Sequence, residues 1–526
     1  MKLSEIRSEG CDVQAWADKG YELPKFDLEA VRQKTHDEPT WIHFGAGNIF
    51  RAFPAALLQR VLDAGAYDRG VIVAEGFDYE IIDKAYRPYD NMSLLVLLKS
   101  DGSIEKRVVA SVTESLKADP QFGADWDRLV EIFRKPSLQM VSFTITEKGY
   151  SVSPADLERG AEPQLIMGKV TALLYERYQA GALPITVQSM DNCSHNGDKV
   201  RSAAMAYAEA WVRAGLVPQD FLDYLKDESK VSFPWSMIDK ITPRPDAKVQ
   251  KMLEEDGFED NYTIITDRHT YTAPFVNAEE TEYLVIEDQY TNGRPPLEQG
   301  GVLYADRETV DKVEKMKVCT CLNPLHTALA IFGCLLGHTS IAGEMADPDL
   351  RDFVTTMAYE EGMPVVIDPG VIEPKAFLEE VLTQRFPNPF IPDTPQRIAT
   401  DTSQKLPIRF GVDIGLHLER GTAGQLQRMP LVLAGWLRYL KAVDDQGQPF
   451  TCSPDPLLEK VQPIAQAIPF GTQATQEDFG SLLEDASIWG VDLKAAGLSA
   501  LVVEDFNRLN QGPGALRTTL EQLRKG

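Results

Sequence analysis

The chain has 526 residues and a net charge of −26, and 43% of its residues are hydrophobic. A chain of this length can form two or more domains with substantial cores. The strong negative charge argues against nucleic acid and anionic membrane surfaces as partners, because a polyanion would be repelled.

Targeting signals are not evident in the sequence. The first residues, MKLSEIRSEGCDVQAW, carry charges throughout and show no apolar signal-peptide core. We find no apolar run approaching the ~20 residues that would span a bilayer. The six cysteines are scattered and none forms a C-x-x-C pair, which is typical of reduced thiols rather than a disulfide framework. We therefore expect a cytoplasmic protein.

The first half of the chain alternates short apolar runs with amphipathic segments. Strands are predicted at 41–44, 71–74, 93–98, 139–145 and 184–188, and helices at 53–65 and 125–134. Strands separated by helices favour a mostly parallel sheet that is covered on both faces.

A glycine loop follows the first of these strands, in the segment WIHFGAGNIFRAFPAA (41–56). Glycines at 45 and 47 permit a tight turn and a close approach of the backbone, and the following helix offers free N–H groups to a pyrophosphate. The third glycine of the usual pattern is replaced by Phe50. The alternative is an ordinary turn between a strand and a helix. The residues predicted to bind a cofactor here are Gly45, Gly47, Asn48, Ile49, Phe50 and Arg51.

Glu75 ends the second predicted strand, where an acidic side chain can accept hydrogen bonds from the adenosine ribose. It lies 30 residues after Gly45, more than the usual ~20, because the connecting segment is long. No arginine follows it to neutralise a 2′-phosphate, since the next residues are Gly-Phe-Asp. We therefore predict NAD rather than NADP; a solvated strand end is the alternative for Glu75.

The strand pattern fades after about residue 305. Helices are predicted at 324–337, 348–361, 375–385, 428–441, 455–467 and 515–525. The simplest division is an α/β, Rossmann-type NAD-binding domain over 1–305 and a mainly α-helical substrate and catalytic domain over 306–526.

Three polar side chains interrupt the apolar segment KVCTCLNPLHTALA (317–330): Lys317, Asn323 and His326. A buried helix with a few satisfied polar groups and a catalytic cluster are both compatible with it. A zinc site formed by Cys319, Cys321 and His326 is disfavoured, because a second ligand pair and the usual C-x2–4-C spacing are missing. The cysteines are better interpreted as apolar packing groups.

Eight segments together resemble the long-chain polyol dehydrogenase family, which contains mannitol dehydrogenases and fructuronate and tagaturonate reductases. They are GAGNIFRAF, FTITEKGY (143–150), MDNCSHNG (190–197), MIDKITP (237–243), LVIED with GRPPLEQGGV (284–302), LNPLH (322–326), RFPNPFIPDTPQRIATD (385–401) and LAGWLRYL (433–440). The resemblance covers roughly residues 40–445. It implies a zinc-independent, NAD(P)-linked dehydrogenase with a Rossmann-type domain and a helical domain.

The resemblance places the family's catalytic lysine on Lys317, its asparagine on Asn323, its histidine on His326 and a further asparagine on Asn192. Without a metal, a side chain must take the hydroxyl proton as hydride leaves. A lysine can do so if burial lowers its pKa from ~10.4. The asparagines could stabilise the oxyanion and the histidine could orient the substrate. Lys315 is the alternative acid/base.

The spacing of the lysine departs from the family. The family has K-x4-N-x2-H, whereas this chain has Lys317-x5-Asn323-x2-His326. One added residue rotates the lysine by ~100° in a regular helix, so the cluster requires an irregular helix. Either the helix begins with Asn323 as N-cap and Pro324 at N1, or a π-type bulge absorbs the extra residue.

Other candidates lie in loops. Thr146 is predicted to contact the cofactor and Asn196 the substrate. His195 could be a turn residue or a metal ligand, and Glu147 with Lys148 a solvated pair or a neighbour of the nicotinamide.

Two cations could serve the substrate end. For Arg397 and Lys405 two roles are open: capping a helix or, as the resemblance implies, reaching a carboxylate or a hydroxyl-rich chain.

The resemblance leaves several substrates open. Our first choice is the interconversion of D-mannonate and D-fructuronate, so the partner would be a small sugar acid. Mannitol with fructose, or tagaturonate, is the alternative within the family. Outside enzymes, the alternative is an inactive NAD-binding protein. We expect a monomer or a small homo-oligomer.

Overall fold

The computed structural model describes residues 1–158 and 162–525. The chain divides into two compact units. Unit 1 comprises Met1–Lys99 and Ser103–Asp311, and unit 2 comprises Ser100–Gly102 and Lys312–Gly526.

The main sheet of unit 1 has six strands, and every neighbouring pair is parallel. In spatial order they are β6 (Val112–Lys117), β3 (Val71–Glu75), β2 (Trp41–Phe44), β7 (Met140–Phe143), β8 (Ile185–Ser189) and β9 (Val231–Ser232). Numbered by their sequence within this sheet, the strands run 3-2-1-4-5-6, which is the doubly wound order of dinucleotide-binding folds. The predicted mostly parallel α/β sheet is thus confirmed.

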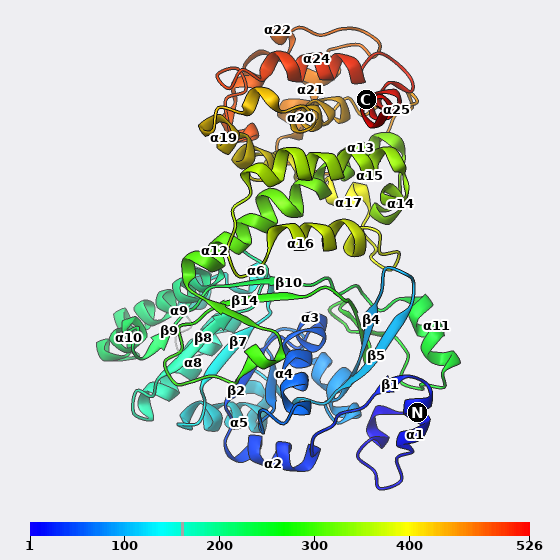
Figure 1. Ribbon diagram of the computed structural model, residues 1–526. Helices are drawn as coiled ribbons and strands as arrows, with labels where there is room; N and C mark the ends of the chain where they lie inside the picture. Colours follow the sequence, from blue (N-terminus) through cyan, green and yellow to red (C-terminus); the bar gives the residue numbers. More distant parts are fainter. Residues whose placement is uncertain (159–161, 526) are drawn as a thin grey trace. The chain divides into compact units, whose positions relative to one another are not determined.

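Helices cover both faces of this sheet (Figure 1). Because side chains alternate along a strand, Ile42 and Phe44 of β2 enter one core and Trp41 enters the other. The first core is closed by α5 (Gly123–Arg134), α8 (Ile166–Gln179) and α9 (Asn196–Arg213), and the second by α3 (Asn48–Ala52) and α4 (Pro54–Asp63).

Two further sheets and a hairpin complete unit 1. The second sheet contains β1 (Tyr21–Glu22), β5 (Ile104–Val109), β4 (Ser93–Leu98) and β13 (Phe275–Glu279); the third contains β10 (Ser236–Asp239), β14 (Tyr283–Glu287) and β15 (Leu303–Ala305); the hairpin is β11 (Ile264–Ile265) with β12 (Tyr271–Thr272). The predicted strand at 93–98 therefore lies outside the six-stranded sheet.

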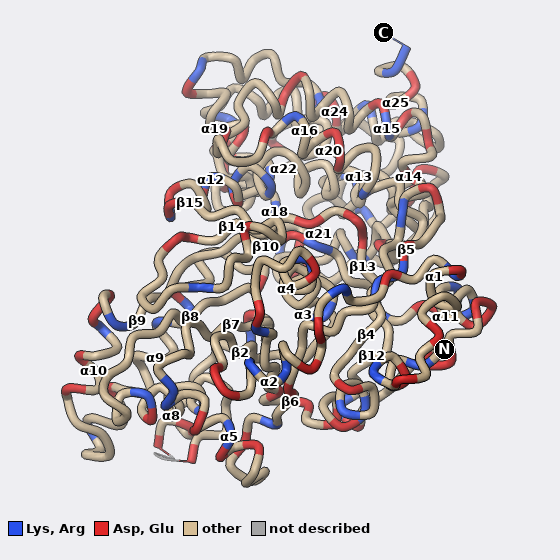
Figure 2. Tube along the Cα trace, turned by 60° about the horizontal axis from the view of Figure 1, so that its bottom comes forward, with Lys and Arg blue, Asp and Glu red and all other residues tan. Residues whose placement is uncertain are grey.

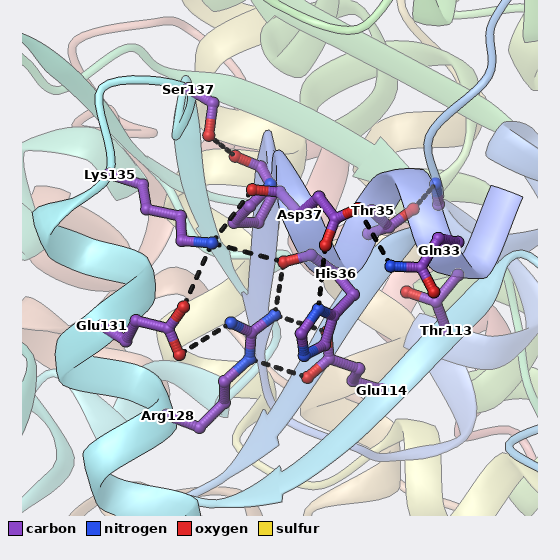
Figure 3. Close-up of polar contacts among 12 residues, drawn as sticks. Gln33, Thr35, His36, Asp37, Thr113, Glu114, Arg128, Glu131, Lys135 and Ser137 are labelled. Carbon is purple, nitrogen blue, oxygen red and sulfur yellow. Dashed lines mark hydrogen bonds and ion pairs between the residues drawn. The ribbon is translucent and has the colours of Figure 1, made fainter.

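Helix α2 (Leu28–Asp37) ends against two cations from the region of α5 (Figure 3). Arg128 Nη2 donates to the carbonyl of His36 at 2.9 Å, and Lys135 Nζ donates to that of Asp37 at 2.9 Å. Cations are stabilising at the C-terminal end of a helix, because the helix dipole is negative there and the last carbonyl groups lack partners within the helix. Glu131 forms ion pairs with both cations and so holds them in place.

Charged residues are distributed along the chain in both units, with acidic and basic residues interspersed (Figure 2). The 79 acidic and 53 basic residues thus produce the net negative charge without a long run of either sign.

Unit 2 is built mainly from helices, as predicted. Its principal helices are α13 (Asn323–Leu336), α14 (Ile341–Ala346), α15 (Pro348–Thr356), α16 (Pro374–Glu380), α17 (Pro395–Ile398), α18 (Thr402–Leu406), α19 (Val412–Glu419), α20 (Arg428–Tyr439), α21 (Leu458–Gln466), α24 (Ser499–Leu509) and α25 (Ala515–Lys525). Gly435 of α20 allows close packing against α13, because a Cβ there would lie 2.5 Å from Phe332 Cε1.

One helical stretch, Arg307–Leu336, is long and apolar enough by length and composition to cross a membrane. This corrects the expectation that no such run exists. Its apolar window is 78% buried inside the protein, which is the behaviour of a core helix. The apolar side chains of α13 accordingly pack against other helices of unit 2.

A buried carboxyl group lies in α14. The side chain of Glu344 is 0% exposed, and neither of its oxygens has a hydrogen-bond partner among residues 1–158 and 162–525. Burial raises its pKa to about 9, with a smaller contribution from Asp347.

Replacing Glu344 with glutamine should stabilise the protein more at pH 8.5 than at pH 5.5. Between its unfolded pKa, near 4.3, and its folded pKa the carboxyl binds a proton only in the folded state, so stability falls as pH rises. We expect a gain of about 1–3 kcal/mol at pH 8.5, measured by urea unfolding at both pH values. Equal effects at the two pH values would contradict a carboxyl that is neutral in the fold.

Candidate active site

The two glycines of the loop after β2 have different structural roles. Gly45 has φ +107°, and a Cβ at this position would lie 2.2 Å from the Thr144 carbonyl oxygen. Gly47 has an ordinary φ of −77°, and a Cβ there would meet nothing within 4 Å. The protein itself therefore requires glycine only at 45. The open space at Gly47 fits a pyrophosphate passing close to the backbone.

Glu75 holds this loop in place. Its carboxylate accepts hydrogen bonds from Ala46 N at 2.8 Å, Phe77 N at 2.8 Å and Asp78 N at 3.1 Å. Burial raises the pKa of Glu75, and the three N–H groups act in the opposite direction. The predicted ribose contact remains a proposal, and the bond to the glycine loop is an additional role.

The side chains that follow the loop turn into the core. Phe50 is 0% exposed and stacks on His43 with ring centroids 4.2 Å apart. Arg51 is 1% exposed and donates to Ala273 O at 2.6 Å and to Asn48 Oδ1 at 2.8 Å. The side chains of Phe50 and Arg51, which were predicted to bind the cofactor, are therefore used by the core, and only their backbone remains for a cofactor contact. The position that lacks the third glycine is filled by a core aromatic ring.

A pocket of about 290 Å³ opens beside this loop in unit 1. Its lining residues are Ile49, Thr146, Glu147, Met190, Asp191, Asn192, Ile238, Lys240 and Thr242. Ile49, Thr146 and Asn192 were predicted site residues, so the structure brings these three together. The pocket lies at the ends of β7 and β8, where a dinucleotide-binding sheet binds its ligand.

Lys240 was not identified from the sequence, although it lies in the MIDKITP motif. Its ammonium group donates to Glu279 O at 2.8 Å and pairs with Glu282 at 3.0 Å. Burial lowers its pKa, and Glu282 opposes that shift. Its partners lie about forty residues further along the chain, so no local pattern indicated this position.

Thr146 has a strained backbone. Its φ of +64° is rare for a β-branched residue. Asp191 holds it, accepting from Ile145 N and Thr146 N at 2.9 Å each and from the Tyr150 hydroxyl. Asp191, which lines the pocket next to Asn192, therefore fixes the backbone at Thr146.

Asn196 does not fit its predicted role. The side chain is 0% exposed, and its amide donates to Asp191 O and Ser236 O at 3.0 Å each and accepts from Ser236 N at 2.9 Å. These bonds attach α9 to β10, so Asn196 is a structural residue rather than a substrate contact.

His195 is a turn residue stacked on Trp235, with centroids 4.0 Å apart, and it pairs with Asp311 at 3.2 Å. No group of three or more His, Cys, Asp or Glu side chains suited to a metal ion occurs in 1–158 or 162–525.

In unit 2 the predicted irregularity around Lys317 is confirmed. Met316–Cys321 form a π-helical turn, η6, in which Leu322 N donates to the Lys317 carbonyl at 3.1 Å. Helix α13 then begins at Asn323, with Leu322 rather than Asn323 as the N-cap. The extra residue is thus absorbed by a π-type turn followed by a new helix start. Lys317 itself is 4% exposed.

A buried carboxyl group anchors this turn. Thr320 Oγ1 donates to Asp413 Oδ1 at 3.0 Å, and Asp413 is 1% exposed. Burial raises the pKa of Asp413 to about 8, and the bond from Thr320 opposes the shift. Burial likewise raises the pKa of Cys321 to about 12, so its thiol is protonated at neutral pH.

His326 lies one turn into α13. Its Nε2 is 3.4 Å from Asp393 Oδ2, and Asp393 also pairs with Arg397, whose side chain is 63% exposed. Burial lowers the pKa of His326 more than Asp393 raises it. The ring is therefore neutral at pH 7.

Two further cations of unit 2, Lys405 and Arg409, lie close enough for their charges to interact. Lys405 donates to the carbonyl groups of Ile398, at 2.8 Å, and Thr400. Burial, followed by the charge of Arg409, lowers the pKa of Lys405 to about 8.

Arg409, which we did not predict, donates to Thr327 Oγ1 at 2.7 Å, and Thr327 in turn donates to the carbonyl of Asn323. Burial lowers its pKa to about 10. Within the described part of the chain, neither Arg409 nor Lys405 has an acidic side chain at ion-pair distance. This positive charge suits an anionic group.

Comparisons with known proteins agree with this arrangement. Residues 39–299 match the mannitol dehydrogenase Rossmann domain and residues 309–510 match the mannitol dehydrogenase C-terminal domain. The chain is 51% identical to the D-mannonate oxidoreductase of Thermotoga maritima over 97% of both chains, and 30% identical to the mannitol 2-dehydrogenase of Phaeosphaeria nodorum over 90% of this chain and 80% of that one.

Among solved structures, the Pseudomonas fluorescens mannitol 2-dehydrogenase complex with NAD and D-mannitol is similar with a TM-score of 0.68 and 26% identity, covering 96% of this chain and 97% of that chain. A D-sorbitol dehydrogenase is similar in fold, with a TM-score of 0.78 at 24% identity, over 94% and 97% of the two chains. The chain therefore belongs to the mannitol dehydrogenase family of oxidoreductases.

Proposed function

We propose that the protein interconverts D-mannonate and D-fructuronate with NAD as the hydride carrier. The similarity to a D-mannonate oxidoreductase, 51% identity over 97% of each chain, supports this choice. The structural observation that carries it is a pair of cations in unit 2. Arg409 bonds to Thr327 in α13, and Lys405 lies close enough to Arg409 for that charge to lower its pKa; neither forms an ion pair with an acidic side chain of the described residues. A sugar acid brings the carboxylate that these cations lack.

We assign cofactor binding to unit 1. When bound, NAD(H) accepts or supplies the hydride. Gly47 leaves room for the pyrophosphate. Glu75, at the end of β3, would accept hydrogen bonds from the ribose hydroxyls through the lone pairs that its three backbone N–H donors do not occupy. Ile49 and Thr146 would line the nicotinamide end of the pocket. Residues 1–305 would thus carry the cofactor and 306–526 the substrate and the acid/base.

We assign the proton transfer to Lys317. In oxidation its neutral amine takes the proton of the substrate hydroxyl, and in reduction its ammonium returns a proton to the carbonyl oxygen. Asn323 and Asn192 are neutral donors that would stabilise the oxyanion. His326, neutral at pH 7, would position a substrate hydroxyl. Asp413 acts through Thr320 and keeps the lysine's turn in its π form.

Substrate affinity should depend on the charge of Lys405. Its pKa of about 8 means that it is charged below pH 8 and neutral above it. A charge-assisted bond to a carboxylate contributes about 1.5–3 kcal/mol, so KM for D-fructuronate should rise roughly tenfold between pH 7 and pH 9.5. Initial rates over this range, with D-fructose as the uncharged comparison, measure the effect.

The matched variant is Lys405→Met, which should raise KM for D-fructuronate at pH 7 about tenfold and remove its rise with pH. A variant whose KM still rises above pH 8 would show that another group titrates.

The function is tested by NADH oxidation with D-fructuronate, D-tagaturonate and D-fructose, using protein treated with EDTA. We expect D-fructuronate to be reduced with the highest kcat/KM and chelation to have no effect. Mannitol and fructose are the second candidate pair, because relatives at 30% identity are mannitol 2-dehydrogenases. Turnover of fructose alone would favour that pair, and binding of NADH without turnover of any of the three would contradict the proposal.

We further propose a cytoplasmic enzyme, monomeric or a small homo-oligomer, that acts on small sugar acids and binds neither nucleic acid nor membranes.

A further inference from the structure

The hairpin β11–β12 packs on the loop that follows β3. Thr266 Oγ1 donates to Asp78 Oδ2 at 2.6 Å, and Asp267 N donates to Glu80 Oε2 at 3.1 Å. The next residue, Arg268, lies with its Cζ 4.3 Å from the centroid of the Phe77 ring. A segment distant in the sequence therefore places a guanidinium group two residues beyond the end of β3.

This position is the adenosine end of the cofactor site. In a doubly wound sheet the ribose lies at the carboxyl end of the second strand, which here is β3. An acidic side chain at that end binds the ribose hydroxyls of NAD, whereas a nearby arginine accommodates the 2′-phosphate of NADP. The charge displayed at this end of β3 therefore sets the choice between the two cofactors.

The acidic residue at the end of β3, Glu75, is buried. Glu75 is 7% exposed, and both of its oxygens accept backbone N–H bonds. The other carboxylates nearby are also engaged: Asp78, 3% exposed, accepts from Thr266, and Glu80 pairs with Lys84. Asp267 is exposed beside Arg268 and is the remaining acidic neighbour.

The guanidinium of Arg268 is, by contrast, available. The side chain is exposed and makes no hydrogen bond or ion pair with any residue in 1–158 or 162–525. It lies over the Phe77 ring, itself 64% exposed, and its charge also reaches Tyr79, whose pKa burial raises and Arg268 lowers. A guanidinium stacked on an aromatic ring keeps its N–H edges free for a phosphate, which it can bind through two hydrogen bonds.

We propose that Arg268, stacked on Phe77, binds the 2′-phosphate of NADP, so that the protein uses NADP(H) as well as NAD(H). This inference rests on the proposed dinucleotide-dependent function. It adds a cation that the segment after Glu75 does not contain, because the arginine comes from a hairpin nearly 200 residues later in the chain.

Binding without substrate tests the inference. NADPH and NADH are titrated separately into the wild-type protein and Arg268→Met by isothermal calorimetry. For the wild type we expect a Kd for NADPH within tenfold of that for NADH. For Arg268→Met we expect the Kd for NADPH to rise at least tenfold and that for NADH to change less than threefold.

Arg244→Met is the matched control, because Arg244 Cζ also lies over an aromatic ring, that of Tyr271 in β12, at 4.6 Å. It should leave both Kd values unchanged. An equal loss of both cofactors in Arg268→Met, or wild-type binding of NADPH more than a hundredfold weaker than NADH, would overturn the inference. Tight binding of NADPH with no reduction of any sugar acid would instead contradict the proposed function alone.

Discussion

Replacing Lys317 with alanine is expected to lower kcat for D-fructuronate reduction by about 10³, because positioned acid–base groups contribute 10²–10⁴. The side chain is 4% exposed and belongs to the π-helical turn that absorbs the extra residue. NADH affinity should be retained, because the glycine loop belongs to unit 1. Steady-state kinetics and an NADH titration measure the two effects. Added methylamine should restore part of the activity, which a purely structural role would not allow.

Lys315→Ala is the matched control. Lys315 ends α12 (Arg307–Lys315) and immediately precedes the same turn, so the variant removes a lysine from the same helical stretch. We expect kcat within threefold of the wild type and an unchanged urea midpoint. If the large loss occurs at Lys315 and not at Lys317, the acid/base assignment moves to Lys315 and the π-type turn has displaced Lys317.

Gly45→Ala should be the most damaging change in the cofactor loop. An alanine at φ +107° is strained, and its Cβ would lie 2.2 Å from the Thr144 carbonyl oxygen. The strain costs about 1–2 kcal/mol, and overpacking typically costs a further 1–3 kcal/mol. We expect a loss of about 2–5 kcal/mol in the free energy of unfolding, together with NADH binding at least a hundredfold weaker, measured by urea unfolding and fluorescence titration.

Gly47→Ala should weaken NADH binding without destabilising the fold. Its Cβ would meet nothing within 4 Å, so the free energy of unfolding should change by less than about 0.5 kcal/mol. The methyl group would occupy the space assigned to the pyrophosphate, and the Kd for NADH should rise about tenfold. Unchanged NADH affinity in this variant would mean that the pyrophosphate does not pass over Gly47.

The doubly wound sheet could be predicted because its strands are short apolar runs between helical segments. The runs at 41–44 and 71–74 coincide with β2 and β3, which pair as neighbours. The run at 93–98 is equally apolar and fully buried. It joins β5 and β13 in another sheet, because strand pairing depends on distant partners that the run itself does not specify.

The irregular turn around Lys317 was predicted, because one added residue has a fixed geometric consequence in a helix. The individual polar residues were less predictable. Asn196 belongs to the same motif as Asn192, yet its side-chain amide already donates hydrogen bonds to the carbonyl groups of Asp191 and Ser236. Arg409 gave no local signal, because its partner Thr327 lies 82 residues away.

The local sequence thus determined three features: the strands of the six-stranded sheet, the turn at Gly45 and the helix break before α13. It could do so because hydrophobic periodicity, φ preference and helix geometry depend on neighbouring residues. Tertiary packing decided the role of each polar side chain. Phe50 and Arg51 turn into the core, and Arg268 reaches the end of β3, because distant backbone and aromatic groups supply their contacts. Whether a polar group serves a ligand or the fold depends on which of its hydrogen bonds the folded protein already satisfies.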